Sequence, residues 1–324
     1  MAKKRRRRKK SGSGGGGIGS MTLNPGEVPT DEELEAEVAA LDEKLTKAAQ
    51  KKYDEAKKEG YDLAALQHMK GKELSVVAKK EKVENWAEMP RQKLVFEILK
   101  AQANRQGLMI GEGTLEVMSD GYGFLRSPEY SYVASADDVY VSPSQIRRFG
   151  LRKGQIIRGL IRPPKETETY FALLRVEAIN GRDPKDVHDL GTFENLTPLH
   201  PEERIHLETE SEVIETRVID LVSPMGFGQR ALIVAPPRTG KTVLLQKLTS
   251  AIAKNHPEAH VIVLLVDERP EEVTDFKRST PDSVEVVAST FDEEATRHIQ
   301  VAEMVMEKAR RMVEFGENVV ILMD

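Results

Sequence analysis

The segment from Ala235 to Thr242 has the sequence A-P-P-R-T-G-K-T, which is typical of a loop that binds phosphate groups. It follows an apolar run at 231–234, which predicts a buried strand, and precedes an apolar pattern with helical spacing. Backbone N–H groups of such a loop and the N-terminus of the following helix attract anionic phosphates. The residues expected to contact nucleotide are Pro236, Pro237, Arg238, Thr239, Gly240, Lys241, Thr242 and Val243.

Lys241 and Thr242 carry the chemistry that this loop predicts. The Lys241 ammonium group can reach the β- and γ-phosphates of ATP, which makes it a candidate catalytic residue, and the Thr242 hydroxyl can ligate Mg²⁺. The tripeptide G-K-T occurs by chance in unrelated chains, but its position between an expected strand and an expected helix favours a nucleotide site. ATP and Mg²⁺ are therefore the predicted cofactors.

Two carboxylates follow apolar runs further along the chain. The run 261–266 is followed by Asp267 and Glu268, and the run 319–323 is followed by Asp324. Because parallel α/β sheets hold ligands at the carboxyl ends of their strands, both sites belong at one edge. Glu268 is the candidate base for the attacking water, with a surface pair to Arg269 as the alternative. Asp324 is predicted to act on Mg²⁺ through water.

A second kind of chemistry is indicated by D-G-Y-G-F-L-R at 120–126. Tyr122 and Phe124 are two residues apart, so on a strand both rings project from one face, with Arg126 in line. Tyr140 and Tyr170 can add rings from neighbouring strands. Bases stack on such rings for roughly 1–3 kcal/mol each, which predicts binding of single-stranded RNA. In the alternative interpretation, the alternating rings fill a core.

Composition excludes several classes of function. The 324-residue chain has no Cys, so disulfides, thiolate metal sites and Cys nucleophiles are excluded. No apolar run approaches the roughly 20 residues that span a membrane, and the basic N-terminus lacks the apolar stretch of a secretory signal. We therefore expect a cytoplasmic protein. Residues 3–10 are all Lys or Arg and predict either a disordered arm that touches phosphates or a leader ahead of Met21.

The elements that must position these residues change in type along the chain. Thr30 and Glu33 form a capping-box pattern that opens an amphipathic helix, which is too short for a coiled coil and is expected to dock on another surface. Short helices follow, and then five short strands with turn residues between them, which predict a small barrel. From residue 213 onward, apolar strands alternate with helical stretches, as in a parallel α/β sheet.

At these motifs the sequence resembles the transcription termination factor Rho family. The resemblance runs from about residue 61 to the end and rests on phrases that include D-G-Y-G-F-L-R, D-D-V-Y-V-S-P-S-Q-I-R-R-F, R-P-P-K-E, G-Q-R-A-L-I-V-A-P-P-R-T-G-K-T and D-E-R-P-E-E-V-T. It implies a homohexameric ring that captures pyrimidine-rich single-stranded RNA, hydrolyses ATP in an RNA-dependent manner and moves 5′ to 3′. It also implies release of the transcript from the RNA polymerase elongation complex.

The resemblance assigns roles to individual residues. The family's primary RNA site falls on Tyr122, Phe124, Arg126, Asp138, Tyr140, Glu168 and Tyr170. Ala235 matches the family, and Arg238 stands where a basic residue is usual. Phe227 departs from the family, which often has Arg there. The resemblance places the second RNA-contacting loops and the arginine supplied to a neighbouring subunit beyond residue 324, so we expect further strands after Asp324.

The fold class expected is multidomain: a helical bundle, a five-stranded OB or cold-shock-like barrel, and a RecA-like P-loop ATPase unit. The expected segments are a disordered basic and Gly-rich tail at 1–29, a helical extension at 30–60, the bundle at 61–106, the RNA-binding barrel at 107–182, a connector at 183–212 and the ATPase unit at 213–324. One alternative is a rotary ATP synthase subunit, which also has a P-x-G-x-G-Q-R stretch but lacks an aromatic barrel. Another is an RNA-binding protein with an inactive ATPase remnant.

Overall fold

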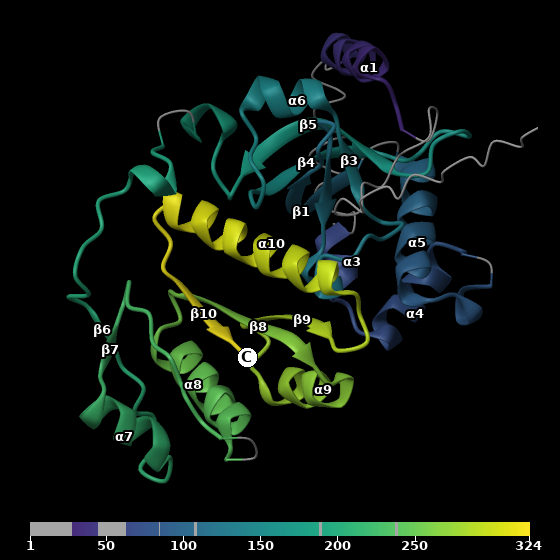
Figure 1. The fold of residues 1–324 in the computed structure, drawn as a ribbon. Helices are drawn as coiled ribbons and strands as arrows, with labels where there is room; N and C mark the ends of the chain where they lie inside the picture. The colour runs from purple at the N-terminus through teal and green to yellow at the C-terminus, as the bar shows by residue number, and fades with distance from the viewer. Residues whose placement is uncertain (1–27, 45–62, 84, 107–108, 188–189, 237–238) are drawn as a thin grey trace, which may run out of the picture.

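The computed structural model describes residues 28–44, 63–83, 85–106, 109–187, 190–236 and 239–324. These residues form a small helical unit, a closed barrel and a three-stranded sheet covered by helices (Figure 1). Most of the predicted tail and residues 45–60 of the predicted helical extension lie outside the described residues. None of the described helices is both long and apolar enough to cross a membrane.

The helical unit packs directly against the barrel. Its helices are α3 (Leu63–His68), α4 (Gly71–Lys80) and α5 (Arg91–Gln106), with a 3-10 turn at Trp86–Glu88. Leu66, Val77 and Ile98 belong to one buried core that continues into the barrel. Phe96 of α5 meets Phe171 of the barrel edge-on, with ring centroids 5.2 Å apart. The helical unit therefore stabilises one side of the barrel by burying apolar surface there.

Five strands close the barrel in the order β1-β2-β3-β5-β4. They are β1 (Met109–Val117), β2 (Gly123–Arg126), β3 (Val139–Val141), β4 (Ile156–Arg162) and β5 (Phe171–Ile179), with α6 (Pro143–Phe149) after β3. Only the β3–β5 pair is parallel; the other pairs are antiparallel. Closure leaves no free strand edge, so the ladder is complete without any other part of the chain.

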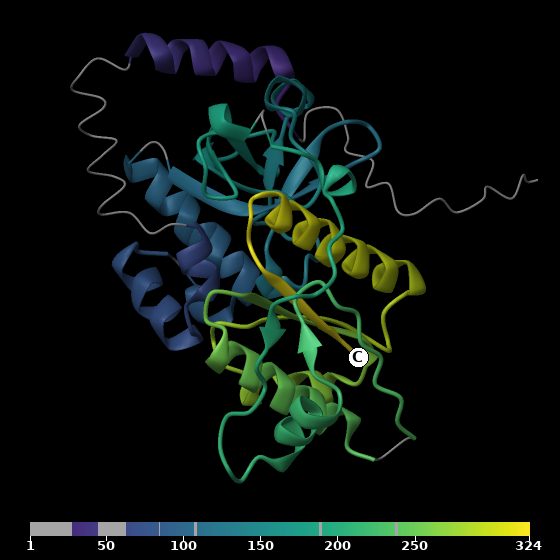
Figure 2. The same cartoon turned by 90° about the vertical axis from the view of Figure 1, so that its left-hand side faces the viewer.

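A single helix lies across the outside of the barrel. This is α1 (Asp31–Lys44), seen above the barrel strands in both views (Figures 1 and 2). Its first turn is closed by a capping box: the Thr30 Oγ1 accepts from the Glu33 N–H at 3.3 Å, and the Glu33 Oε2 accepts from the Thr30 N–H at 3.0 Å. The predicted capping pattern is thus confirmed.

After the barrel the chain passes through short elements before it enters the sheet. They are two 3-10 turns at Pro184–Val187 and Phe193–Asn195, the pair β6 (Arg204–Ile205) and β7 (Met225–Gly226), and α7 (Ile214–Val222). Asp220 of α7 accepts hydrogen bonds from the backbone N–H groups of Leu207 and Glu208, at 2.9 and 2.7 Å. These bonds fix the connector against the helix that follows it.

The last part of the chain contains a parallel sheet with strand order β10-β8-β9. Its elements are α8 (Lys241–Asn255), β8 (His260–Glu268), α9 (Pro270–Ser279), β9 (Glu285–Thr290), α10 (Ala295–Glu314) and β10 (Val319–Met323). In β8, Val261, Val263 and Leu265 pack against α8 and α9, while Ile262 and Leu264 pack toward α10. Helices thus cover both faces, as a parallel sheet requires, and the predicted helical, barrel and α/β arrangement is confirmed.

The strand predicted at 231–234 is wrong. The segment forms no strand, and the side chains of Leu232 and Val234 are 87% and 85% exposed. An apolar, β-prone run becomes a strand only where a neighbouring strand completes its hydrogen bonds. Among the described residues, β10 pairs with β8 alone and no strand lies beside residues 231–236.

The barrel and the sheet meet along α10, which lies between them in both views (Figures 1 and 2). Tyr132, fully buried, donates from its hydroxyl to the Glu285 Oε1 at 2.6 Å and accepts from the Lys308 Nζ at 3.3 Å. The Ser131 Oγ accepts from the Ala288 N–H at 3.0 Å. The loop that carries Ser131 and Tyr132 therefore anchors the barrel to β9 and α10.

Candidate nucleotide and nucleic-acid sites

The phosphate-binding loop ends at a glycine in a left-handed conformation. Gly240 caps α8 with φ 93°, a value that residues with a side chain rarely adopt, and Lys241 is the first residue of the helix. The Thr239 Oγ1 donates to the Pro236 carbonyl at 2.7 Å. Pro237 and Arg238, two of the predicted nucleotide contacts, lie outside the described residues.

Asp324 lies beside Lys241 and Thr242 although it is more than eighty residues away from them in the chain. The Lys241 ammonium group forms an ion pair with the Asp324 carboxylate, and the Thr242 Oγ1 donates to the Asp324 Oδ2 at 3.4 Å. The hydrogen bond with Asp324 raises the pKa of Lys241. Backbone bonds hold Asp324 in place, because its N–H donates to the Leu264 carbonyl at 3.0 Å and its carbonyl accepts from the Val266 N–H at 2.9 Å.

Glu268 lies at the same edge of the sheet, at the end of β8. The pairing of β8 with β9 shifts between Val266 and Glu268, and Asp267 between them has φ 62°, an unusual value for a residue with a side chain. Burial, followed by the negative charge of Asp324, raises the pKa of Glu268. No ion pair between Glu268 and Arg269 occurs in the described parts of the chain, so the surface-pair interpretation finds no support.

The oxygens gathered here suit Mg²⁺. A threonine hydroxyl and an aspartate carboxylate are hard oxygen donors, which this ion prefers, and Thr242 and Asp324 already share a hydrogen bond. A lysine ammonium group beside them provides a positive charge for phosphate oxygens. The residues present therefore fit a nucleotide phosphate chain with its metal ion.

Four rings gather on one face of the barrel and are called the aromatic cluster: Tyr122, Phe124, Tyr140 and Tyr170. Phe124 and Tyr140 are register partners on β2 and β3, with ring centroids 6.0 Å apart. Tyr170 precedes β5 and lies 4.9 Å from Phe124, while Tyr122 lies 5.8 Å from Phe124 and 5.9 Å from Tyr140. Strand pairing thus brings Phe124 and Tyr140 together, and Tyr122 and Tyr170, which immediately precede β2 and β5, complete the cluster.

Arg126 and Asp138, also predicted for the RNA site, form a buried ionic group beside the cluster. The Arg126 Nε donates to the Glu116 Oε2 at 2.9 Å, and the Arg126 guanidinium pairs with Asp138. Asp138 also accepts from the Ser135 N–H at 2.7 Å. Burial raises the pKa of Asp138 to about 7, although Arg126 opposes the shift. Because Arg126 is only 3% exposed, its direct RNA contact stays a prediction.

Glu168 holds a cation that the sequence analysis did not assign. The Arg162 Nη2 donates to the Glu168 Oε1 at 2.9 Å, the Arg162 Nη1 donates to the Glu168 Oε2 at 2.5 Å, and the Lys165 backbone N–H also donates to Glu168. Arg162 and Lys165 therefore belong to the same surface as Glu168. Both cations belong to the phrase R-P-P-K-E at 162–166, and its two positive charges are the local sequence signal for them.

Comparison with known families divides the described chain into three matched parts. Residues 65–107 match the Rho termination factor N-terminal domain, and residues 111–185 match the Rho termination factor RNA-binding domain. Residues 215–324 match the nucleotide-binding domain of the ATP synthase alpha/beta family. The first two matches disfavour the ATP synthase alternative, because they cover the helical unit and the barrel that precede the shared nucleotide-binding domain.

Curated relatives extend the likeness over most of the chain. Proteins named transcription termination factor Rho are 55% identical over 272 residues in Rhodopirellula baltica and 55% identical over 265 residues in Chromobacterium violaceum. These alignments cover 84% and 81% of this chain but 53% and 63% of the relatives. The chain thus spans between half and two thirds of the length of these relatives. The predicted resemblance is confirmed.

Proposed function

We propose that this chain, which belongs to the transcription termination factor Rho family, binds pyrimidine-rich single-stranded RNA on the aromatic cluster and ATP with Mg²⁺ beside Lys241. The observation that carries the proposal is that two sets of side chains, each suited to one ligand, come together on two separate units. One set supplies rings that contact one another on one face of the barrel. The other gathers Lys241, Glu268 and Asp324 at one edge of the parallel sheet.

RNA binding on the barrel uses both rings and charges. Each base that stacks on a ring of the cluster contributes roughly 1–3 kcal/mol, and every base has a face that can stack. Arg162 and Lys165 neutralise backbone phosphates, while Glu168 holds the Arg162 guanidinium in position. Arg126 and Asp138 act in this proposal through their ion pair, which ties β2 to the segment preceding β3.

Nucleotide binding replaces one partner of Lys241 with another. The ammonium group pairs with Asp324; a γ-phosphate would provide a stronger charged partner and leave the carboxylate free. Thr242 and Asp324 would hold Mg²⁺, which neutralises phosphate charge when bound. Glu268, whose pKa is raised by burial and by Asp324, accepts a proton from the attacking water. Arg238 and the backbone of the loop complete the proposed phosphate contacts.

The activity of the whole protein follows from its family. We infer RNA-dependent ATP hydrolysis that drives 5′ to 3′ movement along RNA, in a homohexamer that acts on the RNA polymerase elongation complex in the cytoplasm. The two sites lie on units joined by the contacts of Tyr132 and Ser131, which is a route for coupling RNA capture to the ATP site.

One observation favours the narrower alternative of RNA binding alone. The segment that leads into the phosphate loop is exposed, including Leu232 and Val234, so the loop has less support than a paired strand would provide. A loop that is anchored at just one end must lose conformational entropy to become ordered around a phosphate. This loss weakens nucleotide binding.

Both functions can be tested on one preparation. Fluorescence anisotropy with a labelled oligocytidine reports RNA binding, and a fluorescent ATP analogue with Mg²⁺ reports nucleotide binding. The proposal predicts saturable binding of both ligands at separate sites. RNA binding without nucleotide binding would favour the narrower alternative, and failure of RNA binding in every variant described below would overturn the proposed RNA function.

A further inference from the structure

The aromatic cluster is covered by part of the chain itself. Leu34 of α1 is 2% exposed and belongs to one buried group with Phe124, Tyr140 and Tyr170, with Val38 at its margin. Within this group Phe124 is fully buried, and Tyr140 and Tyr170 are nearly so. A base cannot stack on these rings while Leu34 occupies the same face.

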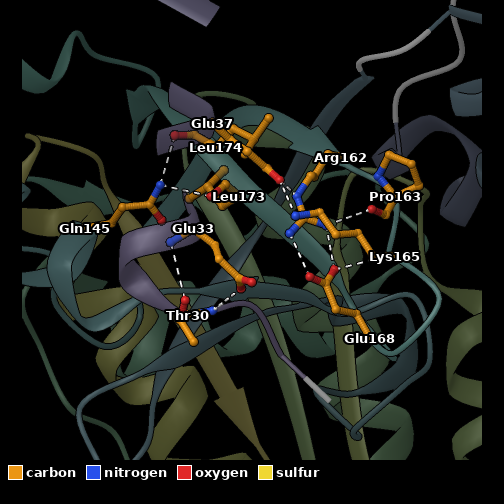
Figure 3. A network of polar contacts seen from close by, with 10 residues as sticks. All are labelled: Thr30, Glu33, Glu37, Gln145, Arg162, Pro163, Lys165, Glu168, Leu173 and Leu174. Atoms are coloured by element: carbon orange, nitrogen blue, oxygen red, sulfur yellow. Dashed lines mark hydrogen bonds and ion pairs between the residues drawn. The ribbon is translucent and has the colours of Figure 1, made fainter. Parts of the chain in front are cut away.

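The charged groups beside the cluster are occupied by the same helix. The Glu37 Oε2 accepts from the Arg162 Nε at 2.6 Å, and the Glu37 Oε1 pairs with the Lys165 Nζ at 2.5 Å. Figure 3 shows Glu37 beside the Arg162 guanidinium, which Glu168 holds from its other side. Asp31 of α1 also lies 3.7 Å from Arg147. The carboxylates of α1 therefore contact the cations that RNA phosphates would require.

The composition of α1 matches that arrangement. Seven of its fourteen residues are Asp or Glu and one is Lys, while Leu34 and Val38 form an apolar ridge one helical turn apart. A negatively charged segment with an apolar surface in its midst presents the barrel with the two features of single-stranded RNA: anionic groups and stacking surface. The Thr30 capping box fixes where the helix begins and so fixes which side chains face the barrel.

We propose that α1 is an intramolecular competitor of RNA, which occupies the aromatic cluster and its cations and must leave before the barrel can bind a strand. This inference rests on the proposed RNA function of the cluster. Residues 45–62 tether α1 to α3, so rebinding is intramolecular and is governed by an effective concentration. RNA affinity is then reduced by the fraction of molecules in which the cluster is free.

Two substitutions in α1 weaken its contact with the barrel and leave every barrel residue unchanged. Leu34→Asp removes the apolar contact and places a charge against the rings, and Glu37→Lys repels Arg162 and Lys165. Burial of a leucine side chain corresponds to roughly tenfold to hundredfold in a docking equilibrium. We therefore expect each variant to bind labelled oligocytidine about tenfold or more tightly than the unmodified chain, as measured by anisotropy at fixed ionic strength.

Glu32→Lys provides the matched control, because it makes the charge change of Glu37→Lys on the exposed side of the same helix. It should leave the RNA affinity within about twofold, since it adds only a screened surface charge. Equal affinity in the unmodified chain and in the Leu34→Asp and Glu37→Lys variants would overturn the competition while leaving RNA binding intact. Absence of RNA binding in every variant would overturn the proposed function and this inference with it.

Amide hydrogen exchange of the unmodified chain gives a second test that needs no substitution. Saturation with oligocytidine should increase exchange across residues 31–44, because the helix loses its docking surface and an isolated helix of this length is marginal in water. RNA that binds to the barrel while residues 31–44 keep their protection would contradict the proposal.

Discussion

The barrel and the parallel sheet hold the residues of their proposed binding sites by different means. In the barrel, every strand has two neighbours, and the aromatic cluster is centred on Phe124 and Tyr140, which are register partners on β2 and β3. In the sheet, Lys241, Glu268 and Asp324 come from three separate segments, and β10 pairs on one side only within the described chain. A closed ladder fixes a binding surface locally, whereas the nucleotide site depends on how helices and strands far apart in sequence pack together.

The largest expected effect concerns a buried residue at the contact between the two regions. Tyr132→Ala should lower the free energy of unfolding by about 3–5 kcal/mol, because it empties a fully buried site. Tyr132→Phe should cost only about 1 kcal/mol, since it keeps the ring and loses the hydroxyl bond to Glu285. Urea denaturation followed by circular dichroism measures both. Two separate transitions with an unchanged barrel transition would show that the regions fold independently.

The nucleotide site should fail without affecting the barrel when its lysine is removed. In a chain extended to the length of its Rho relatives, Lys241→Ala should reduce ATP turnover roughly 10²- to 10³-fold, because the charge that faces the phosphates is lost. Oligocytidine affinity should not change. Lys247→Ala is the matched control, because Lys247 lies on the same helix in an exposed pair with Glu215. A parallel loss of RNA affinity in Lys241→Ala would contradict the separation of the two sites.

Removing a ring of the aromatic cluster should weaken RNA binding but should not change how RNA affinity depends on salt concentration. With α1 displaced by Leu34→Asp, a further Phe124→Ala or Tyr140→Ala change should weaken oligocytidine binding by roughly 1–3 kcal/mol. The slope of affinity against salt should stay constant, because neither ring neutralises a phosphate. Phe193→Ala removes a ring outside the cluster and should have no effect. If the two cluster variants unfold the barrel, the rings are core residues, as the alternative interpretation held.

The smallest expected effect is a pH dependence of barrel stability. Since burial raises the pKa of Asp138 from its usual 3.8 to about 7, the folded state binds the proton more tightly than the unfolded state. The resulting stabilisation is complete below about pH 4 and is lost as the pH rises through 7. Between pH 6 and pH 8 the free energy of unfolding should fall by about 1 kcal/mol from this group. Asp138→Asn should remove that fall, and an identical slope in this variant would assign it to other groups.

Local patterns in the sequence predicted much of this arrangement. The alternation of Tyr122 and Phe124 predicted that the two rings lie together, and they do, although Tyr122 immediately precedes β2 and is not part of the strand. The capping pattern at Thr30 located the start of α1. The prediction that was wrong concerned a segment whose structure depends on a neighbouring strand. The run that contains Leu232 and Val234 has strand propensity but no neighbouring strand within the described chain, and propensity alone cannot supply one.

The position of α1 could not be predicted for a related reason. Leu34 and Glu37 showed that the helix is amphipathic and acidic, but no local pattern specifies which surface an amphipathic helix covers. The burial of Arg126 was hidden in the same way, because its partner Glu116 lies on the neighbouring strand β1. Contacts between elements are set by the assembled fold. A local pattern in the sequence shows which side chains an element presents but does not show which element they contact.

Ultraviolet crosslinking of oligocytidine to the Leu34→Asp chain, mapped by mass spectrometry, tests the central claim most directly. If the aromatic cluster is the RNA site, crosslinks should fall on peptides that contain Phe124, Tyr140 or Tyr170, and they should be weaker in the unmodified chain, where α1 covers these rings. Crosslinks confined to the basic residues 3–10, with none on the barrel, would contradict the account.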